Sequence, residues 1–213
     1  MNNKLAKISV LTVLLILIFD QTLKIFIKMH YPIGYDYTIF SWFHIYFIEN
    51  PGMAFGMELI GKLFLSLFRI AAGVFLIYYL CKIIKRKLPA GYVISISLIL
   101  AGAIGNLLDS VFYGLLFSDS MGQVASFLPA GGGYAPVFYG KVVDMLYFPL
   151  IQGHFPSWFP VWGGEDFIFF RPIFNIADSA VTVGVVLILL FYRRFLSEKS
   201  TKALPDTIEI EHS

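Results

Sequence analysis

Four stretches of the chain are apolar for long enough to cross a membrane as helices. They cover residues 8–27, 63–84, 92–117 and 173–192. A membrane core about 30 Å thick needs about 20 mainly apolar residues in a helix that rises about 1.5 Å per residue. Only 14% of the residues are charged, against about 25% in soluble domains. The sequence therefore predicts an all-α membrane protein, with four transmembrane helices in one domain that covers residues 1–213.

Lysine and arginine residues gather on one side of these four stretches. They precede the first stretch, follow the end of the second at 85–87, and follow the fourth at 193–194. Because cytoplasmic segments carry an excess of these residues, we expect both termini to be cytoplasmic. The basic and apolar N-terminus is expected to be an uncleaved first span, since no small-residue cleavage site follows it. The polar tail 200–213 is expected to be disordered.

Two long segments, 28–62 and 118–172, are then expected to lie outside the cytoplasm. The stretch "HIYFIENPGMAFGM" predicts a short β-like segment followed by a turn at Asn50 to Gly52. The second segment is a long outer loop, in which "PAGGGYAP" predicts a flexible turn. The stretch "PSWFPVWGGEDFIFFRP" has the aromatic composition of a segment at the membrane interface.

Polar residues inside the four spans fall at one common depth. Counting helical rise from the span ends places all of them in the outer half of the membrane core. Ionisable residues at such depth usually face a bundle interior or a wet cavity and mark function. Spacings of three or four residues put each pair of them on one helix face. The residues are Asp20 and Lys24, Arg69, Asn106 and Asp109, and Asn175 and Asp178.

Each of these residues also has a structural interpretation. Asp20 and Lys24 can form an ion pair that lets the first span insert. Arg69 can extend toward the interface or pair with a carboxylate, and Asn106 can bridge helices by hydrogen bonds. Asp109 can accept an N–H group or pair with Arg69. Asp178 lies in the first turn of its helix, where the helix dipole favours a carboxylate. The dipole does not explain why Asn175 lies beside it or why Asp109 lies at the same depth.

Several function classes are excluded by what the sequence lacks. The net charge of +2 and the absence of a basic stripe argue against nucleic-acid binding. The four histidines show no metal-ligand spacing, so neither a metal nor another cofactor is expected. What remains is a set of acids: Asp20, Asp109, Asp144 and Asp178. Two close aspartates that share a proton can activate water, whereas a proton-coupled transporter or channel component uses the same residue types for a pathway.

Five short motifs then occur in a familiar order. Taken together, they resemble the bacterial lipoprotein signal peptidases, also called type II signal peptidases. The motifs are "DQTLK" with Asp20 and Lys24, "ENPGMAFG" with Asn50, Gly52, Ala54 and Phe55, "GAIGNLLDS" with Gly105, Asn106 and Asp109, "VVDML" with Asp144, and "FNIADSA" with Asn175, Ala177 and Asp178.

The resemblance implies an aspartic endopeptidase with Asp144 and Asp178 as its catalytic pair. Its substrates would be prolipoproteins that carry a diacylglyceryl cysteine, cut just before that cysteine. The remaining motif residues would support the site and bind substrate. It also implies a multi-pass protein of the bacterial inner membrane, with the active site toward the periplasmic side. We expect a monomer whose partners are its substrates and membrane lipids.

Two departures from the family pattern stand out. The family commonly has arginine directly after the motif aspartate, where this chain has Ser110. Lys141 and Arg69 are the candidates to replace that charge. The segment before Asp144 is also longer than usual, because of an apolar, glycine-rich insertion over residues 115–139. This insertion is expected to form a lid or a partner surface.

Overall fold

A computed structural model describes residues 3–51 and 60–196 of the chain. Gly52, Ala54 and Phe55 of the second motif, and the tail 200–213, lie outside the described residues. The elements, in chain order, are α1 Asn3–His30, β1 Asp36–Phe40, β2 Phe43–Asn50, α2 Ile60–Lys85, α3 Ala90–Leu108, η1 Asp109–Tyr113, α4 Gly114–Leu116, β3 Val142–Tyr147, β4 Ile151–His154, β5 Asp166–Phe169, β6 Ile173–Phe174, α5 Ile176–Leu187, η2 Ile188–Tyr192 and η3 Arg193–Leu196.

Four helices within the described ranges are long and apolar enough to cross a membrane. They cover Lys4–His30, Gly61–Lys85, Ala90–Leu116 and Ile176–Leu196. The third of them is the most buried and packs against the other three, so α3 forms the centre of the bundle. Large apolar side chains on the other helices point outward, as expected for surfaces that face lipid.

The fourth span begins later than the hydropathy predicted. Ile173 and Phe174 form strand β6 instead of the first helical turn, and the helix starts at Ile176. Two apolar residues suit a buried strand as well as a helix, so composition alone could not separate them. The third span reaches close to its predicted end, but it changes to a π-helix, η1, over Asp109–Tyr113 before the last α-helical turn, α4.

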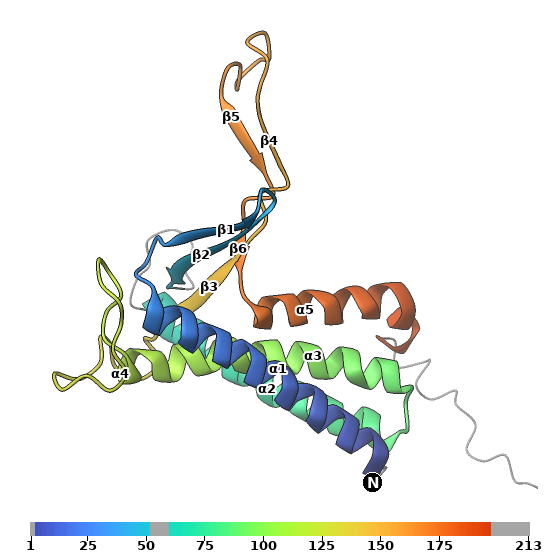
Figure 1. The fold of residues 1–213 in the computed structure, drawn as a ribbon. Helices are drawn as coiled ribbons and strands as arrows, with labels where there is room; N and C mark the ends of the chain where they lie inside the picture. Colours follow the sequence, from blue (N-terminus) through green and yellow to red (C-terminus); the bar gives the residue numbers. More distant parts are fainter. Residues whose placement is uncertain (1–2, 52–59, 197–213) are drawn as a thin grey trace, which may run out of the picture.

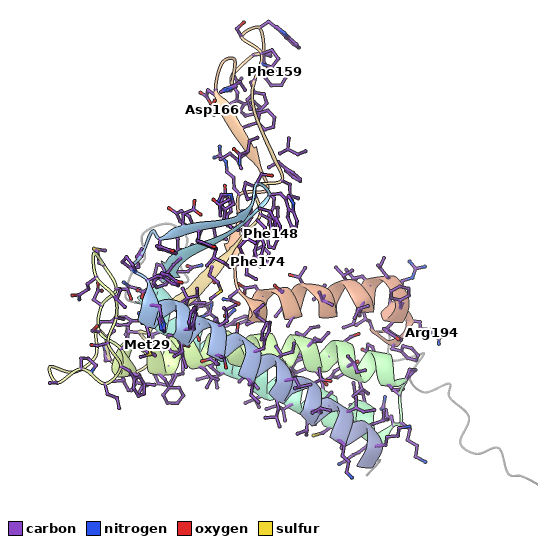
Figure 2. The ribbon with its side chains drawn as sticks, in the orientation of Figure 1. Met29, Phe148, Phe159, Asp166, Phe174 and Arg194 are labelled. Carbon is purple, nitrogen blue, oxygen red and sulfur yellow. The ribbon has the colours of Figure 1, made fainter. Side chains whose placement is uncertain are left out.

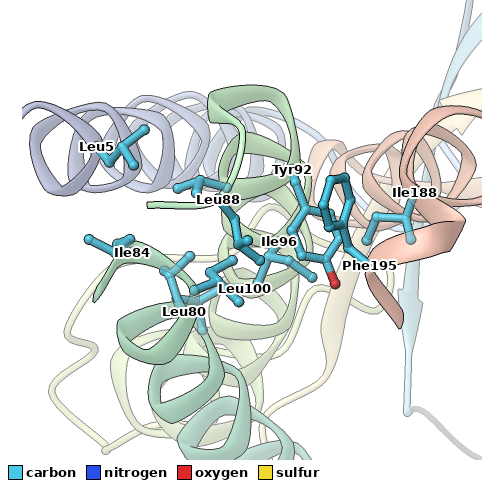
Figure 3. Packing of buried hydrophobic residues seen from close by; sticks show 11 residues of the cluster. Leu5, Leu80, Ile84, Leu88, Tyr92, Ile96, Leu100, Ile188 and Phe195 are labelled. Atoms are coloured by element: carbon cyan, nitrogen blue, oxygen red, sulfur yellow. The ribbon is translucent and has the colours of Figure 1, made fainter. Parts of the chain in front are cut away.

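One end of the bundle is filled by an apolar cluster. Figure 3 shows Leu5 of α1, Leu88 of the α2–α3 turn and Phe195 of η3 around Ile96 of α3. The beginning of α1 and the end of the fourth span therefore lie at the same end of the bundle (Figure 1). The buried charged residues Asp20, Lys24 and Asp109 lie toward the other end, next to the sheet.

The larger sheet has four antiparallel strands in the order β1-β2-β3-β6. In its centre Asp144 of β3 lies opposite Ile48 of β2, and Leu146 lies opposite Phe174 of β6. Since β6 is followed directly by Asn175 and α5, the sheet connects the strand that carries Asp144 to the helix that carries Asp178. The predicted strand before Asn50 is confirmed as β2.

The insertion leaves the end of the third span and returns to it. Phe117 pairs with Phe127 in an isolated bridge, and the backbone N–H of Ala135 donates to the carbonyl of Gly114. At its end the N–H of Gly140 donates to the carbonyl of Ser110 over 2.9 Å. A side chain at Gly140 would collide with the Asp109 carbonyl, so only glycine permits this close return.

Candidate active site

A buried ion triad joins the first and third spans. Lys24 Nζ lies 2.9 Å from an Asp20 oxygen and 2.8 Å from an Asp109 oxygen, and all three side chains are inaccessible to solvent. The predicted Asp20–Lys24 pair is therefore confirmed, and Asp109 pairs with Lys24 instead of Arg69. Buried charges are stable only when paired and fully hydrogen-bonded. The triad fulfils this condition through additional N–H donors.

Those additional donors come from three different elements. Gln21 Nε2 donates to Asp109 over 2.9 Å, and the N–H of Val143 in β3 donates to the same carboxylate over 3.3 Å. The N–H of Ala177 in α5 donates to Asp20 over 2.9 Å. The triad therefore holds β3 and the start of α5 against the bundle.

Asn106 connects this triad to Asp178. Its Oδ1 accepts a hydrogen bond from Lys24 Nζ over 2.9 Å, and its Nδ2 donates to Asp178 Oδ1 over 2.7 Å. This contact requires a close approach of α3 to α5. Gly102 and Gly105 allow it, because a Cβ at either position would lie within 3.0 Å of Ala177.

Asn175 contacts both aspartates of the last two motifs. Its Oδ1 accepts the N–H of Asp178 over 2.9 Å, and Asp178 Oδ2 accepts the N–H of Asn175 over 3.3 Å. This reciprocal capping box fixes the start of α5. Its Nδ2 donates to Asp144 Oδ1 over 2.7 Å and also lies 3.0 Å from Asn106 Oδ1. One fully buried asparagine thus contacts both carboxyl groups, that of Asp144 through its side-chain Nδ2 and that of Asp178 through its backbone N–H.

The two carboxyl groups have different environments. Asp144 is buried in the sheet, whereas Asp178 is half-buried at the helix start. Burial raises the pKa of Asp144 to about 7, and the charge of Asp178 contributes to the rise. Hydrogen bonds from Asn50 and Asn175 act in the opposite direction on this pKa. Asp144 can therefore hold a proton near neutral pH beside a second carboxyl group.

Arg69 reaches the position at which this chain departs from the family pattern. Its Nη1 donates to Ser110 Oγ over 2.7 Å, and Ser110 Oγ donates to the carbonyl of Asn106 over 2.9 Å. Asp109, Asp178 and Asp144 all attract its guanidinium group. Lys141, the other candidate, lies 3.3 Å from a Glu49 oxygen. Arg69 is thus the cation that contacts Ser110.

Sequence reasoning missed a second buried polar cluster next to this site. Lys28 pairs with Glu49, and its Nζ donates to Ser120 Oγ over 2.8 Å, while Ser120 donates to Glu49 over 2.8 Å. The cluster ties the insertion to α1 and to the residue before Asn50. The spacing of Lys28 four residues after Lys24 was the signal that could have revealed it.

The structure brings the predicted site residues of the described ranges into one network. Gly52 lies outside these ranges. No group of three or more metal-ligating side chains occurs in residues 3–51 and 60–196. The assembled residues are Asp20, Lys24, Asn50, Asn106, Asp109, Asp144, Asn175, Ala177 and Asp178.

Comparison with known families settles which kind of protein carries this network. The sequence profile described as Signal peptidase (SPase) II matches residues 12–194. The chain belongs to the signal peptidase II family. A lipoprotein signal peptidase of Porphyromonas gingivalis is 52% identical over 192 residues, which are 90% of this chain and 85% of the relative. One from Amoebophilus asiaticus is 34% identical over 89% of this chain and 79% of its own length.

Solved structures of membrane enzymes share the fold of this chain. A bacterial membrane enzyme determined at 1.9 Å resolution superposes with a TM-score of 0.58 at 25% identity, over 85% of this chain and 90% of the other. A second one, at 2.3 Å, gives a TM-score of 0.56 over 93% of both chains. As a member of the signal peptidase II family the protein is a membrane-embedded hydrolase. The alternative of a transporter or channel component is not supported.

Proposed function

We propose that the protein cleaves prolipoproteins just before a diacylglyceryl-modified cysteine, with Asp144 and Asp178 as its catalytic pair. One observation carries this assignment. The side chain of Asn175 donates to Asp144 over 2.7 Å while its backbone N–H donates to Asp178 over 3.3 Å. Two carboxyl groups, one from a strand and one from a helix, therefore contact the same asparagine next to the end of a membrane span.

The environments of the two groups support a division of roles. Asp144, with a pKa raised to about 7, would carry the proton, and Asp178 would be ionised. Asp178 accepts N–H groups from Asn106 and Asn175, which suits a carboxylate. In this mechanism Asp178 takes a proton from water as the water oxygen attacks the scissile carbonyl carbon. Asp144 gives its proton to the carbonyl oxygen.

The tetrahedral intermediate then returns both carboxyl groups to their starting state. Asp178 gives its newly acquired proton to the nitrogen of the scissile bond, and the C–N bond breaks. Asp144 recovers a proton as the carbonyl forms again. The products are the free signal peptide and a protein that begins with the lipidated cysteine. No metal or organic cofactor takes part in these steps.

The surrounding residues would hold the substrate and support the pair. Asn50 ends strand β2 and hydrogen-bonds to Asp144, so a peptide bound near it would lie next to the carboxyl pair. We propose that Asn50 and Gly52 clamp the extended peptide through backbone hydrogen bonds. Asp20, Lys24, Asn106, Asp109 and Ala177 would fix the relative positions of β3, α3 and α5.

We further propose that the protein works as a monomer in the bacterial inner membrane, with both termini cytoplasmic and the site toward the periplasm. The distribution of basic residues supports this orientation, because those that flank the spans at 4–7, 82–87 and 193–194 lie at the bundle end that contains Leu5 and Phe195. The carboxyl pair lies toward the opposite end. A substrate could then keep its lipid in the outer leaflet while its peptide bond reaches the pair.

The test is cleavage of a lipidated prolipoprotein, followed by mass analysis of the products. Asp144→Asn and Asp178→Asn should each abolish cleavage without loss of membrane insertion. Asp36→Asn is a matched control, because Asp36 is an exposed aspartate of β1 that pairs with His44 instead. Full activity of either variant of the pair would refute the assignment of that residue.

A further inference from the structure

The segment between β3 and β6 projects away from the rest of the molecule. Strands β4 and β5 form a separate two-stranded sheet, in which Ile151 pairs with Phe169 and His154 with Asp166. We refer to residues 151–169 as the aromatic hairpin. Figure 1 shows that it runs across the direction of the four helices, and Figure 2 shows Phe159 and Asp166 on it, beyond Phe148 and Phe174 at its base.

The loop of the aromatic hairpin has an ordered interior and an apolar exterior. Phe155 stacks on Phe159, with ring centroids 5.2 Å apart, and packs against Phe167 at 4.9 Å. Trp158 and Val161 point outward, with 78% and 84% of their surface exposed. Trp162 packs against Phe155 at 5.9 Å but leaves 51% of its surface exposed. A two-stranded hairpin is only marginally stable in water by itself. Such a cluster of exposed aromatic side chains therefore indicates a surface that binds something.

The attachment of the hairpin fixes its level relative to the membrane. Strand β6 ends at Phe174, two residues before the span that starts at Ile176. Phe169 and Phe170, at the end of the hairpin that leads to β6, are exposed, as is Val183 on the outward surface of α5. Because the hairpin runs across the helices, it stays at the level of the span ends. Its apolar surface thus continues the interface that the spans already make with lipid.

The chemistry of the hairpin selects the headgroup region within that interface. Tryptophan and other aromatic residues concentrate at this level of a membrane. The free edges of β4 and β5 carry backbone groups that need water, so the hydrocarbon core is excluded. The paired side chains of His154 and Asp166 also need contact with water. The hairpin carries the acidic residues Glu165 and Asp166 and no lysine or arginine, so attraction to anionic headgroups does not drive binding.

We propose that the aromatic hairpin is a membrane-interface anchor, which lies in the phospholipid headgroup region of the leaflet nearest the sheet. It connects β3 to β6, so it would hold Asp144 and the start of α5 at a fixed depth. The anchor itself requires only that the protein spans a membrane. Its use in setting the depth of the carboxyl pair rests on the proposed function.

The test uses the tryptophans of the chain as depth probes. The chain has 3 tryptophans, so the Trp42→Phe variant keeps only Trp158 and Trp162, both in the hairpin. The full-length variant is placed in phosphatidylcholine vesicles whose lipids carry bromine either near the headgroup or near the end of the acyl chain. We expect bromine near the headgroup to quench most of the fluorescence and bromine at the chain end to quench little of it.

Fluorescence that no brominated lipid quenches would overturn the proposal, and would indicate a surface for a protein partner or for water. Stronger quenching from the chain end would overturn the assignment to the headgroup region. A second measurement compares cleavage in bilayers and in detergent micelles. Substitution of Trp158, Val161 and Trp162 by serine should lower cleavage in bilayers only. The quenching result does not depend on cleavage, so failure of the anchor and failure of the proposed function can be told apart.

Discussion

The two functions of the Asn175 side chain can be separated by two substitutions. Asn175→Ala removes both the oxygen that caps α5 and the Nδ2 group that donates to Asp144. Asn175→Ser removes Nδ2 but keeps an oxygen that can cap the helix, because serine is as good an N-cap residue as asparagine. The comparison therefore isolates the contact with Asp144 from the capping of α5.

The size of each effect follows from these contacts. Loss of an N-cap costs about 1 kcal/mol, and loss of a hydrogen bond to the protonated, neutral Asp144 carboxyl group costs about 0.5–1.5 kcal/mol. We expect Asn175→Ala to lower the free energy of unfolding by about 1.5–2.5 kcal/mol and Asn175→Ser by about 0.5–1.5 kcal/mol. Both variants should lose most of their cleavage activity, because neither holds Asp144 beside Asp178.

The assay is reversible unfolding in mixed detergent micelles, combined with cleavage rates as a function of pH. The hydrogen bond from Asn175 lowers the pKa of Asp144, so its removal should raise that pKa further above its normal value. Residual activity of Asn175→Ser should therefore persist to higher pH than that of the unmodified protein. Equal stability of the two variants, or normal cleavage by Asn175→Ser, would refute the reasoning.

Three other perturbations test different parts of the site. Lys24→Met leaves the buried carboxylates of Asp20 and Asp109 without their ammonium group. It should lower the free energy of unfolding by about 3–5 kcal/mol in the same unfolding assay. An unchanged free energy of unfolding would contradict the buried triad. Cleavage should fall as the pH rises through about 7, because Asp144 then loses the proton that it must donate; a rate that stays constant well above this pH would contradict that role. Arg69→Ser should lower cleavage, because it removes the guanidinium group that contacts Ser110. The double variant Arg69→Ser with Ser110→Arg should restore part of the cleavage. A double variant no more active than Arg69→Ser alone would show that the site does not require this guanidinium group.

Much of the bundle was predictable from the sequence, because the necessary signals are local. Span length follows from hydropathy, and helical spacing predicts that Asp20 and Lys24 pair on one face. Counting helical rise predicted that the polar residues of different spans lie at one level in the membrane. The contacts Lys24–Asp109 and Asn106–Asp178 join such residues across helices. Asp144 was already among the candidate acids, and the family motifs selected it as the partner of Asp178.

The remaining features depend on tertiary contacts. The choice of Lys24 over Arg69 as the partner of Asp109 is decided by which helix faces meet. Small residues such as Gly105, where a Cβ would lie 2.9 Å from Asp20 Oδ2, control that packing. Strand β6 could not be separated from the helix that follows it, because its two residues are apolar in either state. The role of Lys28 depends on Ser120, which lies far away in the sequence.

The two ends of the insertion lie next to each other, so the length of this loop does not set the position of the site residues. The N–H of Gly140 bonds to the carbonyl of Ser110 over 2.9 Å, and the N–H of Val143 reaches Asp109 over 3.3 Å. The chain can therefore grow or shrink at the exposed turn of Gly131 and Gly132 without displacement of Asp144, provided that Ser120 keeps its contacts with Lys28 and Glu49. The same site offers an engineer a place to insert a tag or a small domain into this membrane enzyme.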